Sequence, residues 1–209
     1  MEIMYVNKSN IELTTTAFYG DVLDLIDMGI DIEGIEYDDN WTVRKFLSKS
    51  LLARKRIETV FKYLDLDTKY LSYRIKELSK VTFKYVLLSH ALLNNKRTIV
   101  FERFDVGLSN KEKKNMVQII KKLKNDGFTL IFLTHDILFA NQVCENIIVV
   151  KNKKEVYNGT IEKLVKSKRN IIDMPPVVKF VEYANKKNAG LTYTLDHKEL
   201  LKDIFREVV

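Results

Sequence analysis

Two short apolar runs, each ending in polar residues, constrain the fold of this chain most. They are Arg97–Glu102 (RTIVFE) and Thr129–Asp136 (TLIFLTHD). Runs of this length that are rich in β-branched and aromatic residues are typical of buried strands. A helical pattern over Asn110–Asn125 separates them, and Gly127 after it is a C-terminal stop signal. Strand, helix and strand in this order predict parallel pairing within an α/β sheet.

The same alternation continues toward the C-terminus. Further strands are expected at Leu130–Leu133, Ile147–Val150 and Val156–Tyr157, with helices at Phe139–Val143 and Ile161–Lys166, the latter capped by Thr160. Residues 42–95 have a helical pattern that begins after Thr42. Met174–Asn188 and His197–Val209 indicate a two-helix tail, with Pro175 and Pro176 at its entry.

Residues 1–40 are ambiguous. Their patterns indicate short strands at Glu2–Val6, Ile11–Thr16 and Ile30–Tyr37, with a short helix at Asp21–Met28. Acidic residues are dispersed between Asp21 and Asp39, and we interpret them as solvated rather than as a metal site.

Composition narrows the class of protein. At 209 residues with 46% hydrophobic content, the chain can bury a core of its own. No apolar run approaches the roughly 20 residues that span a bilayer. The single Cys144 fits a reducing cytosol, and we expect it to pack in the interior. His90 is expected to pack as well, and His197 to lie in the tail.

The net charge of +7 would suit nucleic acid or an anionic membrane surface. The lysines are scattered, however, and no patch interleaves them with aromatic residues. We interpret them as a solvated surface, so nucleic acid is not the expected partner.

The order of these pieces resembles the ATP-binding cassette (ABC) family over residues 42–166. Leu78-Ser79-Lys80-Val81-Thr82 stands where the family has its Leu-Ser-Gly-Gly-Gln signature. Arg97–Glu102 stands at the Walker B strand, Gly107-Leu108-Ser109 near the D-loop, and Leu133-Thr134-His135-Asp136 at the switch histidine. The segment Lys151–Thr160 is similar to the strand pair that ends in Gly-Thr. The tail resembles that of energy-coupling factor (ECF) transporter ATPases, at Met174-Pro175, Ala184-Asn185 and Leu200–Ile204.

This resemblance implies a parallel sheet like that of P-loop nucleotide hydrolases, truncated at the N-terminus, with a helical subdomain and a helical tail. The expected segments are divergent strands (1–40), the helical subdomain (41–95), half of the catalytic core (96–166) and the tail (167–209). In the family, the residue at the position of Glu102 polarises the attacking water, and the one at His135 contacts the γ-phosphate. Ser79 and Lys80 occupy the signature position and are weak candidates for contacting a nucleotide.

Departures from the family pattern bear on function. No glycine-rich string ends in Gly-Lys-Ser or Gly-Lys-Thr, because Gly20, Gly29 and Gly34 are isolated. Only 41 residues precede Thr42, about half the usual number, which favours a deletion. Phe101 replaces the Walker B aspartate that orders Mg²⁺. Lys80 and Val81 replace the two signature glycines.

These departures favour a non-catalytic ABC-like subunit or regulator of an ABC or ECF-type transporter, with Glu102 and His135 vestigial and no cofactor. Its partners would be an intact ABC ATPase, a transmembrane subunit or a second copy of the chain. Its expected localisation is the cytoplasm or the inner face of the membrane. Two alternatives stay open. One is a divergent ATP-binding subunit that uses ATP and Mg²⁺, and the other is a nucleic-acid-binding or ring-forming protein. An apolar docking patch would be sought at Trp41, Phe46, Leu51 and Phe61.

Overall fold

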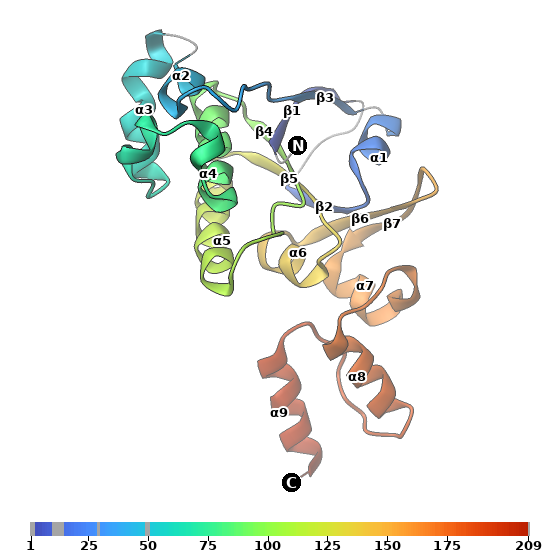
Figure 1. Cartoon of the computed structure of the whole chain (residues 1–209). Helices are drawn as coiled ribbons and strands as arrows, with labels where there is room; N and C mark the ends of the chain where they lie inside the picture. Colours follow the sequence, from blue (N-terminus) through green and yellow to red (C-terminus); the bar gives the residue numbers. More distant parts are fainter. Residues whose placement is uncertain (1–2, 10–14, 29, 49–50, 209) are drawn as a thin grey trace.

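A single mixed sheet forms the framework of the protein (Figure 1). The computed structural model describes residues 3–9, 15–28, 30–48 and 51–208. Within these residues the sheet has seven strands in the order β3-β1-β4-β5-β2-β6-β7. The strands are β1 (Ile3–Ser9), β2 (Thr16–Tyr19), β3 (Ile30–Gly34), β4 (Thr98–Glu102), β5 (Thr129–Leu133), β6 (Asn146–Lys151) and β7 (Lys154–Thr160).

The four central strands are parallel. β4 pairs with β5, and β2 lies between β5 and β6. The outer strands are antiparallel, with β1 between β3 and β4 on one side and β7 beside β6 on the other. Asn152 and Lys153, both at positive φ (50° and 61°), make the tight turn of the β6–β7 hairpin. The predictions of an α/β class and of parallel pairing between the two runs are therefore confirmed.

Helices connect and cover the strands. They are α1 (Val22–Asp27), α2 (Val43–Leu47), α3 (Leu51–Tyr63), α4 (Lys80–Leu93), α5 (Asn110–Asn125), α6 (Ile137–Val143), α7 (Ile161–Ser167), α8 (Pro176–Asn185) and α9 (His197–Val208). In Figure 1, α2 and α3 lie beside α4 at one end of the sheet, and α8 and α9 lie beyond α7, away from it. None of the helices among the described residues is both long and apolar enough to cross a bilayer.

Local capping explains why many predicted ends are correct. Ser109 accepts a hydrogen bond from the amide of Glu112, whose carboxylate accepts one from the Ser109 amide, so α5 begins at Asn110 as predicted. Gly127 follows its end at a φ of +81°. Thr42 and Thr160 likewise cap α2 and α7.

Other predicted ends differ. The predicted helix at Phe139 starts two residues earlier, because the Asp136 carboxylate accepts from the amides of Leu138 and Phe139. The predicted strand Ile30–Tyr37 ends at Gly34. Most of the predicted strand Ile11–Thr16 lies outside the described residues, and β2 runs from Thr16 to Tyr19.

The two faces of the sheet belong to different cores. Side chains alternate along β4, so Ile99 and Phe101 join the main core beneath the larger helices, whereas Val100 points to the other face. That second core is smaller and includes Leu25 of α1 and Ile30 of β3. The central strands β4 and β5 are thus buried on both faces, which explains their continuously apolar sequences.

Residues singled out for packing are buried. Cys144 and His90 are each 4% exposed, and the His90 ring stacks on Phe46 at 4.6 Å between centroids. Phe46 and Phe61 are fully buried, so these two belong to the core rather than to an exposed docking patch. Trp41 is half-buried beneath the Lys45 ammonium, and the side chain of Leu51 lies outside the described residues. His197 is exposed at the start of α9, as expected for the tail.

Candidate functional site

The candidate site lies where the parallel strands β4, β5 and β2 end. In open α/β sheets, ligands bind in the crevice outside the carboxyl ends of the strands. Adjacent main chains are joined there, because the Arg103 amide donates to the Leu133 carbonyl (2.8 Å) and the Thr134 amide to the Phe18 carbonyl (3.0 Å). The residues that follow the three strands therefore meet at one edge.

Glu102 and His135 both lie at this edge. Glu102 is the last residue of β4 and pairs in register with Leu133 of β5, two residues before His135. Glu102 is half-buried, whereas His135 is exposed, and its ring packs edge-on against Tyr19 at 4.8 Å. The sheet thus places the two predicted catalytic positions on neighbouring strands.

A buried hydrogen-bond network fixes the end of β5. The Thr134 hydroxyl donates to the Asp105 carboxylate (3.2 Å) and accepts from the Asp136 amide (3.0 Å). Thr134 and Asp105 are 3% and 8% exposed, so this contact is shielded from water. Asp136 caps α6 and also forms an ion pair with Lys113 of α5 at 3.3 Å. These contacts hold Thr134 and Asp136 in structural roles on either side of His135.

The connection from β2 to α1 is short and acidic. After Tyr19, only Gly20 and Asp21 precede the helix. The Asp21 carboxylate accepts from the amides of Leu23 (2.9 Å) and Asp24 (3.3 Å), and the Asp24 carboxylate accepts from the Asp21 amide (2.9 Å). A side chain at Gly20 would come within 2.7 Å of the Asp24 carboxylate, so that carboxylate would have to move. Two carboxylates of the chain therefore occupy the first turn of α1.

Phe101 is part of the core at the Walker B position. It is fully buried and stacks on Phe132 of β5, with ring centroids 4.9 Å apart and planes within 7°. Phe104 packs on it at 4.8 Å. This position offers aromatic carbon where a magnesium site needs oxygen.

Ser79 and Lys80 lie on a different element, at the N-terminus of α4. The Ser79 hydroxyl caps this helix by accepting from the Thr82 amide (3.0 Å), and Lys80 is its exposed first residue. The hydroxyl thus has a structural partner within its own chain.

Lys84 is a functional candidate that the sequence patterns did not identify. It is fully buried, and its ammonium donates to the carbonyls of Phe104 (2.8 Å) and Val106 (2.7 Å) in the turn after β4. The ammonium also lies 5.1 Å from the centre of the Phe104 ring. The available signal was a single lysine inside the otherwise apolar part of the α4 sequence.

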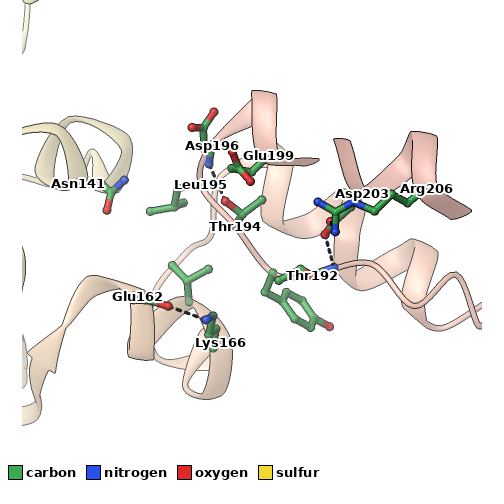
Figure 2. Close-up of a pocket in the computed structure, with 12 residues that line it drawn as sticks. Asn141, Glu162, Lys166, Thr192, Thr194, Leu195, Asp196, Glu199, Asp203 and Arg206 are labelled. Carbon is green, nitrogen blue, oxygen red and sulfur yellow. Dashed lines mark hydrogen bonds and ion pairs between the residues drawn. The ribbon is translucent and has the colours of Figure 1, made fainter. Parts of the chain in front are cut away.

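A separate polar cavity of about 540 Å³ lies between α7 and the segment that leads into α9 (Figure 2). Four of its charged groups are paired with one another, because Lys166 forms an ion pair with Glu162 (2.5 Å) and Arg206 forms one with Asp203 (3.3 Å). Asp203 also accepts from the Thr192 amide at 3.1 Å. Most of the charged groups of this cavity therefore already have partners within the chain.

The mixed sheet with a parallel centre, its interleaved helices and the residues gathered at one edge define an α/β fold. Solved cassettes share this fold. The dimeric structure of MJ0796, a bacterial ABC transporter cassette, superposes with a TM-score of 0.57 at 17% identity, over 75% of this chain and 90% of that one. CbiO1 from Clostridium perfringens, part of the ABC transporter complex cbiONQ, gives 0.59 at 16% identity, over 83% and 89%.

Sequence relatives agree with the fold. The probable ABC transporter ATP-binding protein p29 of Mycoplasma pneumoniae is 31% identical over 157 residues, covering 73% of this chain and 64% of p29. The energy-coupling factor transporter ATP-binding protein EcfA1 of Mycoplasma genitalium is 23% identical over 161 residues, covering 76% and 58%. This chain thus spans less than two thirds of the length of either relative. No family model matches the sequence. In sequence and in fold, the chain is similar to ATP-binding proteins of ABC transporters.

Proposed function

We propose that this protein is a non-catalytic ABC-ATPase-like subunit or regulator of a membrane transporter of the ABC or ECF type. The observation that carries the proposal is the β2–α1 connection. A phosphate loop joins a parallel strand to a helix and offers free amides at the helix N-terminus. Here the chain's own Asp21 and Asp24 bind those amides, and their negative charges would repel phosphate.

Two further features support the proposal. The buried Phe101 leaves no carboxylate at the Walker B position to order a magnesium ion. The residues present therefore do not fit a magnesium nucleotide, and we assign no catalytic step to Glu102 or His135. The proposed function requires no cofactor.

The transporter association rests on the relatives. Among them are ATP-binding proteins of ABC and energy-coupling factor transporters, and one structural neighbour, CbiO1, is described as part of an ABC transporter complex. We infer that this chain pairs with an intact cassette ATPase, a transmembrane subunit or both, at the inner face of a membrane. The segment 41–95 is the proposed contact for the transmembrane partner, and half-buried Trp41 marks the part of it to test first.

The second candidate is a divergent subunit that still binds ATP. It is favoured by the positions of Glu102 and His135 at the ends of adjacent parallel strands. Under this reading Asp21 and Asp24 would have to leave the α1 amides before phosphate could approach them.

Nucleotide binding separates the two candidates. A fluorescent ATP analogue is titrated with the full chain, with and without Mg²⁺, beside an intact cassette ATPase as the positive control. We expect no saturable binding to this chain below about 1 mM, which corresponds to roughly 4 kcal/mol of binding free energy. Magnesium-dependent binding in the micromolar range would instead establish the second candidate.

Transporter association is tested by affinity purification from the native cell under mild detergent, with the recovered chains identified by mass spectrometry. The proposal predicts an intact cassette ATPase or a transporter membrane subunit in the eluate from the wild type. The Trp41→Asp variant is expected to lose the membrane subunit, whereas Tyr183→Asp on α8 retains it. Recovery of the chain alone from both wild type and variants would contradict this part of the proposal.

A further inference from the structure

A second cavity, of about 320 Å³, lies beside the N-terminal half of α4 and includes Lys80, the residue at the signature position. We call it the α4 pocket. Its apolar walls come from three parts of the chain that are distant in sequence: Ile3 and Ile35 around strands β1 and β3, Phe83 and Leu87 on α4, and Val106 in the turn after β4. Its volume lies within the range of small-molecule sites, about 300 to 1,000 Å³, and such sites are mostly apolar with few polar groups.

Lys80 is the charged residue among those that line the pocket. Its side chain is exposed, and no carboxylate in the described part of the chain forms an ion pair with it. It is also the first residue of a 14-residue helix, whose N-terminus carries a positive partial charge. The pocket therefore combines an apolar interior with a positive rim.

Two sets of contacts restrain the walls of the pocket. Lys84 binds the Phe104 and Val106 carbonyls, which fixes the turn that forms one wall. Tyr37 also lines the pocket, and its ring packs edge-on against Phe83, with centroids 5.0 Å apart. A cavity with fixed walls loses little entropy when it binds a ligand, because the walls need no further ordering.

We propose that the α4 pocket binds a small amphipathic anion, with a ring-sized apolar body and one carboxylate, sulfonate or phosphate group. The apolar body lies against Phe83 and Leu87, and the anionic group meets Lys80 at the rim. A nucleoside triphosphate does not fit, since one lysine cannot balance its charge and the walls offer little to its polar groups. This inference goes beyond the proposed function, because it concerns a small-molecule site rather than a contact with a transporter.

The test compares two dyes of nearly the same shape. 8-Anilinonaphthalene-1-sulfonate carries one negative charge, whereas N-phenyl-1-naphthylamine carries none. We expect both to bind the full chain at a saturable site, as measured by fluorescence titration. Lys80→Gln should weaken binding of the sulfonate by roughly five-fold, equivalent to about 1 kcal/mol, and leave the neutral dye within two-fold.

A matched pair of variants locates the site. Val106 is 51% exposed, so Val106→Trp can fill the pocket without entering the core, and it should remove most of the binding of both dyes. Val156→Trp, at a 44% exposed position on β7, should leave binding unchanged. Lys111→Gln is the charge control, because Lys111 is an exposed lysine in the first turn of α5.

Three outcomes would overturn the inference. They are unchanged sulfonate binding in Lys80→Gln, an equal loss in Lys111→Gln, and full binding of both dyes in Val106→Trp. Circular dichroism confirms that each variant is folded. None of these outcomes depends on ATP or on a transporter, so this inference and the proposed function can fail separately.

Discussion

At the scale of single residues, Lys84 shows how burial gives a charged side chain a structural role. A lysine is almost never fully buried unless its charge is compensated. Here two carbonyls from the turn after β4 accept hydrogen bonds from its ammonium. The same turn contains Asp105, which bonds Thr134 at the end of β5. One lysine thus connects α4 to the edge where Glu102 and His135 lie.

We expect Lys84→Ala to lower the free energy of unfolding by about 2 kcal/mol, because it leaves two buried carbonyls without their donor. Urea denaturation measures the change. Lys80→Ala, four residues earlier on the same helix but exposed, should change stability by less than about 0.5 kcal/mol. Equal effects of the two variants would show that the buried contacts contribute nothing.

At the scale of elements, the short helix α1 begins at the carboxyl end of the parallel strands, where ABC proteins bind phosphate. It has only six residues, which is too short for a helix to be stable without capping and packing. The Asp21–Asp24 capping box stabilises its first turn, and Leu25 anchors it in the second core. The helix that covers the far face of the sheet therefore depends on the carboxylates that close its N-terminus.

The capping role predicts a specific pattern of variants. Asp21→Ala should destabilise the protein by about 1 kcal/mol, whereas Asp21→Asn should cost only a few tenths, since asparagine caps helices nearly as well. Asp27→Ala serves as the control in the last turn of the same helix, since it removes only a surface ion pair with Lys153 (3.2 Å) and should change stability by less than about 0.5 kcal/mol. Thermal and urea unfolding give the values, and an equal loss in the Ala and Asn variants would argue against the cap.

At the scale of the whole molecule, the main core links global stability to pH through Cys144. Burial raises the pKa of this thiol from its ordinary value of 9.0 to about 12. Below pH 9 the thiol is neutral in both the folded and unfolded chains, so its full contribution to stability is present. Between pH 9 and 12 the Cys144 thiol ionises only in the unfolded chain, so the free energy of unfolding falls as the pH rises.

The loss attributable to this thiol should reach roughly 2 kcal/mol near pH 10.5, at about 1.4 kcal/mol per pH unit. The measurement is the difference in unfolding free energy between pH 9 and pH 10.5, by urea denaturation, for the wild type and for Cys144→Ala. Cys144→Ala loses the same packing at both pH values. The difference between wild type and variant in the pH-dependent slope of the unfolding free energy therefore reports the titration of the thiol alone. Identical slopes would mean that the thiol is not shielded in the folded protein.

Much of the fold could be predicted because its signals are local. The ends of α5 follow from Ser109, Glu112 and Gly127, which act within a few residues of the helix. The strand character of 98–102 and 129–133 follows from composition alone. By contrast, the predicted strand at Ile30–Tyr37 is three residues longer than β3, and the start of β2 was also misplaced, because the partner strands decide where pairing ends.

The sequence by itself determined the types of elements and their parallel arrangement. It also determined the resemblance to ABC proteins and the absence of a Gly-Lys-Ser/Thr string. Each of these depends on residues that are close together in the chain. Only the tertiary structure decided that β2 lies between β5 and β6, that Asp21 and Asp24 occupy the helix start at this edge, and that Lys84 is buried beneath the turn after β4. These features depend on contacts between segments far apart in the chain. Burial and strand order arise from such contacts, and no local pattern encodes them.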